Sequence, residues 1–456
     1  MKKLSALVLV ILLTACISSP ATRMPASPTG TPDLQATGTA QVYASWTEMY
    51  QTLTAQPPQD TPAPAATETL PTNMPSPAEA TPTPIPALQP GQPVTLTNIH
   101  MIDAATGWAI EGGGHIVRTR DGGNTWQDVT PPQGIYNAGG FFALDANTAW
   151  ATSVCKENCS SNIQFVTIWR TTDSGATWAN SSLCLIGDCG YTPDVSAEYY
   201  IPKSLQFINE KTGWLLVSVN QLMYQDRYRL YKTSDGGANW AYITGSGEGP
   251  LAISAIGIVF LNENNGWFGI TLAGGPLDPA PQWYTSMSKT TDGGYTWDDF
   301  GLEPAFLPTP SASNSYECGT SAVSAIPPKT IDLTFYCDVN EENSRPRFYF
   351  HFHSFNSGES WQSWQETGGT DFINATTGWR LSAVDKGKYN LEQTSDGGAH
   401  WLQVKTVQWN GALDFVSQME GWALATSGDA TVLVHTKDGG KTWDTIQLPK
   451  LNPIPN

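Results

Sequence analysis

The stretch Thr119-Arg120-Asp121-Gly122-Gly123-Asn124-Thr125-Trp126 decides the fold, because the chain repeats it. The shared pattern is Thr or Ser, then Asp two residues on, Gly two residues after that, and a Trp that closes the copy. Seven copies of one turn mean seven copies of one supersecondary unit, so internal repetition sets the architecture. The six further copies begin at Thr171, Thr233, Thr290, Ser354, Thr394 and Thr436.

Each copy, here called an Asp-box turn, lies between two β-rich runs and is predicted to be a hairpin turn. A carboxylate at the start of a turn can accept hydrogen bonds from backbone N–H groups one to three residues on. The second glycine, such as Gly123, suits a position that needs positive φ. Asn356 replaces the acid in the fifth copy, and its amide oxygen can still accept. The sequence therefore predicts turn caps rather than catalysts at Asp121, Asp173, Asp235, Asp292, Asn356, Asp396 and Asp438.

A second landmark, Gly-Trp or Ala-Trp after a short apolar run, occurs in six of the units. Each unit thus has four strands, A to D, with a tight A–B turn and an Asp-box C–D turn. Such a sheet buries both faces only by stacking on two neighbours. We expect an all-β, seven-bladed β-propeller over residues 94–456. The tryptophans of this landmark are predicted to lie in the core, at Trp108, Trp150, Trp214, Trp267, Trp379 and Trp422.

The first 93 residues have a different character. Met1-Lys2-Lys3 and the apolar run that follows predict an export signal over residues 1–15, too short to span a bilayer. Leu13-Thr14-Ala15-Cys16 resembles a bacterial lipobox, which implies a lipid on Cys16 and an extracytoplasmic, membrane-anchored protein of the cell envelope. Residues 16–93 are rich in Pro, Thr and Ala, and this composition predicts a disordered tether.

The cysteines favour disulfides, because an even number remains after Cys16 in an exported chain. Cys318 and Cys337 are equidistant from Pro327-Pro328, so they are expected to be bonded cross-strand neighbours. This fifth unit has Lys329-Thr330-Ile331 where the others have Gly-Trp. The second unit holds four cysteines with three possible pairings, which the sequence leaves open: Cys155, Cys159, Cys184 and Cys189.

The two ends of a propeller differ in this chain. The A–B and C–D turns form one end, the turn face, and the B–C and D–A loops form the other, the loop face. The longest insertions all fall on the loop face, at 153–165, 184–203, 220–229, 271–286, 302–316 and 339–346. Since loops on a rigid scaffold often carry binding residues, we predict a binding face that includes Tyr191, Tyr199, Tyr200, Tyr224, Arg227, Tyr228, Arg229, Trp283, Tyr284, Arg345 and Arg347.

The net charge and the sequence motifs exclude some classes of partner and ligand. A net charge of −18 and a pI near 4.6 oppose contact with phosphate backbones, so nucleic acid is not an expected partner. His351 and His353 alternate on a strand and could present two metal ligands. No third ligand is evident in the sequence, so we expect a solvent-facing or blade-interface pair and no metal or cofactor.

The sequence pattern that runs from Gly-Trp-Ala to the Asp-box turn, at 107–126 and 421–443, resembles the repeat of the photosystem II stability/assembly factor family. These are seven-bladed lumenal propellers without catalytic activity. The resemblance implies a non-enzymatic scaffold that docks a membrane-protein or envelope partner. We expect this protein to be a monomer. No single binding residue is carried over from that family.

The sialidases resemble the chain more distantly. Their Arg-Ile-Pro motif has its nearest match in Tyr200-Ile201-Pro202, which lacks the arginine. Xyloglucanases place a catalytic acid and a catalytic base in a cleft between two propellers. This chain has enough residues for only one propeller. The alternative function is a cell-surface glycoside hydrolase, sialidase-like or xyloglucanase-like, or a carbohydrate-binding propeller.

Overall fold

The computed structural model describes residues 88–89, 91–135, 137–154, 166–183, 200–222, 225–245, 254–271, 287–302, 315–340, 347–446 and 450–451. All of them belong to one compact unit, Pro77–Asn456. The predicted signal peptide, Cys16, nearly all of the tether and the four cysteines of the second unit lie outside the described residues.

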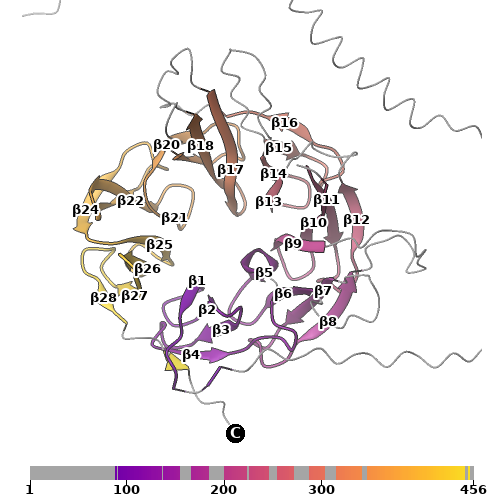
Figure 1. The fold of residues 1–456 in the computed structure, drawn as a ribbon, viewed down its shortest axis with the longest axis horizontal. Coiled ribbons are helices and arrows are strands. Elements are labelled where there is room, and N and C mark those ends of the chain that lie inside the picture. The colour runs from indigo at the N-terminus through magenta and orange to yellow at the C-terminus, as the bar shows by residue number, and fades with distance from the viewer. Residues whose placement is uncertain are drawn as a thin grey trace, which may run out of the picture. The chain divides into compact units, whose positions relative to one another are not determined.

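The described strands form the predicted seven-bladed, all-β propeller, arranged as a ring in Figure 1. Each blade has four antiparallel strands in chain order, with the first strand innermost and the fourth outermost. Blades 1 to 4 are β1 (Leu96–Met101), β2 (Gly107–Glu111), β3 (Ile116–Thr119) and β4 (Thr125–Asp128); β5 (Phe141–Ala143), β6 (Ala149–Val154), β7 (Val166–Thr171) and β8 (Ala179–Leu183); β9 (Tyr200–Phe207), β10 (Gly213–Leu222), β11 (Gln225–Thr233) and β12 (Ala241–Gly245); and β13 (Ser254–Phe260), β14 (Gly266–Thr271), β15 (Met287–Thr290) and β16 (Asp298–Phe300).

Blades 5 to 7 complete the ring. They are β17 (Ser315–Ile326), β18 (Thr330–Asn340), β19 (Arg347–Ser354) and β20 (Gln362–Glu366); β21 (Thr370–Phe372), β22 (Gly378–Asp385), β23 (Lys388–Thr394) and β24 (Leu402–Val407); and β25 (Asn410–Phe415), β26 (Gly421–Ser427), β27 (Ala430–Thr436) and β28 (Asp444–Thr445). A short 3₁₀ helix, Ala138–Gly140, precedes β5. The pair Thr271 and Gly319 joins the sheets of blades 4 and 5.

The ring closes at blade 1. The C-terminal strand β29 (Lys450–Leu451) adds to the outer edge of this blade, parallel to β4. On the inner side, the backbone N–H of Met101 donates to Asp414 of blade 7 at 2.6 Å. The indole of Trp422 donates to the Gly122 carbonyl at 2.9 Å. Backbone pairing and side-chain bonds therefore both connect the last blade to the first.

The Gly-Trp landmark explains how neighbouring blades pack. Trp150 stacks on Phe207 of the next blade, with ring centroids 3.7 Å apart. The Phe207 ring in turn lies over Gly213, where an added Cβ would come within 2.5 Å of it. The same sandwich recurs where Trp214 stacks on Phe260 and Trp379 on Phe415. The glycine makes room for the aromatic ring of its own blade, and the tryptophan covers that ring from the preceding blade.

Polar side chains on the innermost strands also connect blades. Gln206 accepts from the Phe260 N–H at 2.6 Å and donates to the Phe260 carbonyl at 3.1 Å. Asp371 on the first strand of blade 6 accepts in the same way from the Phe415 N–H on the first strand of blade 7, at 2.6 Å. Burial raises the pKa of Asp371 to about 7, against the opposing hydrogen bond from Phe415.

Blade 5 replaces the aromatic sandwich by a buried polar group. Asp332 Oδ1 lies 2.9 Å from His351 Nε2 and 2.8 Å from His353 Nδ1. His353 stacks on Phe372 of blade 6 at 3.9 Å, and its Nε2 lies 3.0 Å from the Ala375 carbonyl. The two histidines are thus buried at a blade interface, and the solvent-facing alternative was wrong because their strand packs against blade 6.

The register of blade 5 places Cys318 directly opposite Cys337, and Cys337 is disulfide-bonded. The pairing between these two cysteines stays a prediction. One predicted insertion needs correction. Residues 220–229 are mostly strand rather than loop, because β10 and β11 continue their pairing to Leu222 and Gln225.

Candidate functional site

The Asp-box turns are closed hydrogen-bond networks. In the first copy, Asp121 Oδ1 accepts from the Thr119 hydroxyl and from the Thr125 N–H, each at 2.9 Å. Its Oδ2 accepts from the Thr125 hydroxyl at 2.6 Å. Most of these bonds come from the residue four positions on, further than the one to three expected from the sequence. Asn356 keeps the geometry, because it accepts from the Ser360 N–H and donates to the Ser360 hydroxyl.

Hydrogen bonds of this kind lower the pKa of the carboxyl group in several of the Asp-box turns. The hydroxyl and backbone N–H of Thr442 hold the pKa of Asp438 at about 2. The backbone and side chain of His400 do the same for Asp396, whose pKa is also about 2. A carboxyl group with so low a pKa is a poor general acid or base near neutral pH. The Asp-box turns are thus suited to holding hairpins together.

The residues predicted for the binding face differ in where the structure places them. Tyr228 is only 1% exposed, because it points into the core against Phe268 at 4.8 Å, and burial raises the pKa of its hydroxyl. Its assignment to the binding face was wrong. Arg227 and Arg229 lie in β11, and Tyr200 begins β9. The remainder lie outside the described residues: Tyr191, Tyr199, Tyr224, Trp283, Tyr284 and Arg345.

Arg347 lies at the loop-face end of β19 and is engaged within its own blade. Its Nε and Nη2 donate to the two oxygens of Asp338 at 2.6 and 2.8 Å. Its guanidinium lies 4.2 Å from the centre of the Tyr336 ring. The hydrogen bond to Asp338 raises the pKa of Arg347. A ligand that used this arginine would have to share it with a bidentate partner.

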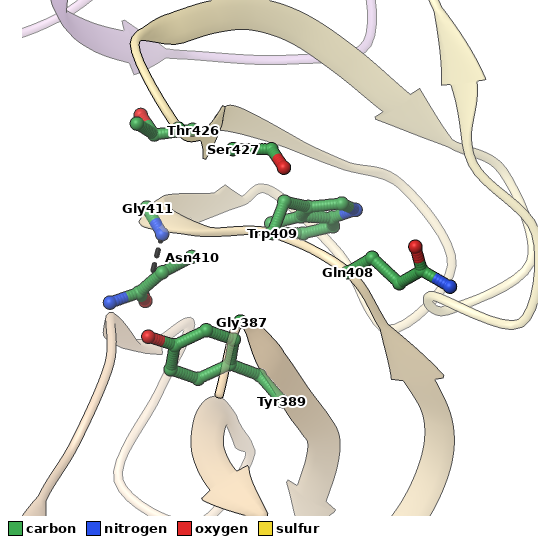
Figure 2. A pocket seen from close by; sticks show the side chains of 9 residues that line it. Gly387, Tyr389, Gln408, Trp409, Asn410, Gly411, Thr426 and Ser427 are labelled. Atoms are coloured by element: carbon green, nitrogen blue, oxygen red, sulfur yellow. Dashed lines mark hydrogen bonds between the residues drawn. The ribbon is translucent and has the colours of Figure 1, made fainter. Parts of the chain in front are cut away.

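A pocket of about 400 Å³ opens on the loop face between blades 6 and 7 (Figure 2). Three short connections build it: the turn between β22 and β23, the link between β24 and β25, and the turn between β26 and β27. Its lining comprises Gly387, Tyr389, Gln408, Trp409, Asn410, Gly411, Thr426, Ser427 and Gly428. All of these connections belong to the B–C and D–A positions that the sequence assigns to the loop face.

Packing fixes the two aromatic residues of the pocket. Trp409 meets Trp443 edge to face, with centroids 5.4 Å apart and planes at 82°. Trp409 and Tyr389 are half-buried and pack on the core shared by blades 6 and 7. Gly411 holds the intervening backbone close to β26, since a Cβ there would lie 1.8 Å from the Leu424 carbonyl. The pocket wall is therefore preformed rather than dependent on ligand binding.

The polar groups of the pocket are neutral, and several have no hydrogen-bond partner in the part of the chain that the structure describes. Asn410 uses its oxygen to accept from the Gly411 N–H at 2.8 Å, which leaves its amide N–H groups available. Thr426 shares a 2.9 Å bond with Thr431. Among the described residues, the Tyr389 hydroxyl, the Gln408 amide and the Ser427 hydroxyl have no hydrogen-bond partner.

The pocket lies on short connections, whereas the sequence predicts binding residues in the long insertions. The available signal was Trp409, which belongs to neither tryptophan landmark and directly precedes Asn410-Gly411 at a D–A link. Elsewhere in the described part of the chain, no group of three or more His, Cys, Asp or Glu side chains could hold a metal ion. No helix within that part is long and apolar enough to cross a membrane.

The fold and site thus define a propeller with a preformed neutral pocket. No family model matches the chain. A xyloglucanase from Paenibacillus sp. is 26% identical over 238 residues, which is 48% of this chain and 21% of that protein. The chain therefore spans about a fifth of the length of this relative.

Solved structures with a similar arrangement are more distant in sequence. YCF48 bound to a D1 peptide is 16% identical, with 78% of this chain and 99% of that one covered and a TM-score of 0.39. YCF48 from Cyanidioschyzon merolae is 16% identical, with coverage of 76% and 97% and a TM-score of 0.40. The GH74 enzyme of Niastella koreensis is 13% identical, with coverage of 78% and 66% and a TM-score of 0.30.

Proposed function

We propose that this chain is a non-catalytic binding propeller that docks a membrane-protein or envelope partner through its loop face. A lipid on Cys16 anchors it at the extracytoplasmic side of a bacterial membrane, and residues 16–93 tether the propeller to that anchor. The observation that carries the proposal is the contrast between the two ends of the ring. The Asp-box turns use their polar groups internally, whereas the pocket between blades 6 and 7 offers unused ones.

The proposed lipid anchor is compatible with recognition through the loop face alone. A lipid at the chain terminus followed by a long flexible segment holds a propeller near a membrane without fixing its orientation. The rigid ring of stacked blades then exposes the loop face to membrane or envelope proteins that lie within the length of the tether. Recognition by a preformed surface avoids the entropy loss of ordering loops on binding.

The test captures partners with the full chain from detergent-solubilised envelopes of the cells that make it. Gln408 and Gln418 form a matched pair, since both are exposed glutamines near blade 7 but lie on opposite faces. We expect one membrane or envelope protein to be retained by the wild type and by Gln418→Arg, and reduced at least tenfold by Gln408→Arg. Equal retention by both variants, or loss with Gln418→Arg alone, would contradict the proposal.

A glycoside hydrolase is the second candidate, and the 26% identity to a xyloglucanase favours it. Such an enzyme needs two carboxyl groups facing the same glycosidic bond. Incubation of the full chain with xyloglucan oligosaccharides and aryl glycosides decides between the candidates. Turnover that a single Asp or Glu substitution on the loop face abolishes would replace the binding function by an enzymatic one.

A further inference from the structure

We infer that the pocket between blades 6 and 7 binds a neutral glycan of one or two sugar units. This ligand class goes beyond the docking of a protein partner. The inference rests on the proposed function only in treating the loop face as the recognition face. The pocket combines a fixed aromatic wall with neutral hydrogen-bonding groups, and each of these features restricts the ligand.

The aromatic wall selects a ligand with a flat C–H surface. An indole carries a negative π face, against which the C–H groups of a pyranose ring pack favourably. Trp409 is held in place by its edge-to-face contact with Trp443, so it loses little side-chain freedom on binding. Figure 2 shows Ser427 on one side of Trp409 and Tyr389 on the other, so polar groups flank the ring.

The polar lining selects a ligand with many hydroxyl groups. The Gln408 amide offers two donors and an acceptor, and the Ser427 hydroxyl can donate or accept. Sugar hydroxyls also do both, so they can satisfy each of these groups at once. The side-chain oxygen of Asn410 accepts a hydrogen bond from Gly411, and its NH₂ group adds donors beside these residues. An apolar ligand of the same size would leave these groups without partners and would bind more weakly.

The charge of the pocket excludes ionic ligands. Its lining contains neither a carboxylate nor a cationic side chain. A net charge of −18 repels an anionic sugar or phosphate, and no lining cation compensates. A cation would lack a carboxylate to neutralise it. A neutral ligand with many hydroxyls is the chemistry that remains.

The size of the pocket sets the length of the ligand and its affinity. A volume of about 400 Å³ lies near the lower end for small-molecule sites. One or two sugar rings have roughly 12 to 23 non-hydrogen atoms, and ordinary ligand efficiencies then correspond to a Kd between about 10 µM and a few mM. A longer glycan could extend from the open mouth into solvent.

The test titrates the full chain with a panel of neutral oligosaccharides of glucose, galactose, xylose and mannose, followed by calorimetry and tryptophan fluorescence. At least one glycan should bind in the stated range. Trp409→Ala should weaken it at least tenfold, Trp409→Phe only a few-fold, and Gln418→Ala on the turn face not at all. Circular dichroism and the unfolding midpoint of each variant identify any loss of folding, and Trp409→Phe keeps the aromatic wall if Trp409→Ala unfolds.

Three results would overturn the inference. These are no binding by any neutral glycan, binding that Trp409→Ala leaves unchanged, and preferential binding of anionic glycans or of short peptides in the same titration. The protein-docking proposal has a separate outcome, because captured partners can be lost with Gln408→Arg even where no glycan binds. Conversely, glycan binding without any captured protein would leave the pocket assigned and the docking role refuted.

Discussion

Replacing Asp371 by asparagine should stabilise the propeller at alkaline pH and leave it almost unchanged at acid pH. Asp371 is half-buried at the interface of blades 6 and 7 and accepts a hydrogen bond from the Phe415 N–H. Burial raises its pKa from 3.8 to about 7. Because the folded-state pKa is the higher one, folding disfavours the charged form. The resulting loss of stability begins near pH 4 and is complete above pH 7.

The shift of about three pKa units corresponds to roughly 4 kcal/mol. Asp371 keeps part of its surface exposed, so solvent screening reduces the effect, and we expect about 2 kcal/mol. An asparagine oxygen can still accept from Phe415. Gln206 shows that a neutral amide suits the equivalent relation between blades 3 and 4, where it bonds to both the N–H and the carbonyl of Phe260.

Urea unfolding followed by tryptophan fluorescence at pH 4.5 and pH 8 measures this difference. Asp371→Asn should be more stable than the wild type at pH 8 by about 2 kcal/mol and much closer to it at pH 4.5. Asp438→Asn is the control of opposite sign. The pKa of Asp438 is held at about 2, so its carboxylate stabilises the fold at both pH values and its loss should destabilise at both. A destabilised Asp371→Asn at pH 8 would refute the reasoning.

Four further predictions concern single residues. Trp150→Phe should cost about 1 kcal/mol more than Trp267→Phe in chemical denaturation, because the Trp150 indole donates to the Gly236 carbonyl at 2.8 Å whereas that of Trp267 lacks a partner among the described residues. Asp121→Ala should cost about 1 kcal/mol through its lost hydrogen bonds and leave partner capture unchanged, as denaturation and the capture assay can measure. Burial opposes the charge of His351, but the hydrogen bond with Asp332 and the charge of Glu366, 3.7 Å from Nδ1, raise its pKa to about 9, so the stability it adds is full below pH 6.5 and is lost as the pH rises through 9. His351→Gln should therefore destabilise more at pH 6 than at pH 9.5. Cys16→Ser should move the protein from the membrane fraction to the soluble fraction.

The repeats made the fold predictable. The Asp-box and Gly-Trp patterns fix the strands, their order and the stacking of one blade on the next, since each pattern encodes a local constraint. The glycine before Trp214, for example, is required by the Phe207 ring above it. Local constraints that recur in every or nearly every unit determine a ring without knowledge of distant contacts.

Features that depend on contacts between strands distant in sequence were harder to predict. Alternation placed His351 and His353 on one side of β19, but their shared partner Asp332 is set by the register of β18. Tyr228 appeared to lie in a loop because the continued pairing of β10 and β11 has no strong sequence signal. The pocket is built from three short links whose proximity follows only from how blades 6 and 7 stack.

Photo-cross-linking from the two faces tests the central claim most directly. Lys386 lies in the turn between β22 and β23 on the loop face, and Lys441 lies in the seventh Asp-box turn on the turn face; both side chains are exposed. A photoreactive residue is placed at each position in turn, and adducts are measured in the cells that make the full chain. The account predicts adducts to an envelope partner from position 386 and none above background from position 441. Adducts of equal yield from position 441 would contradict it.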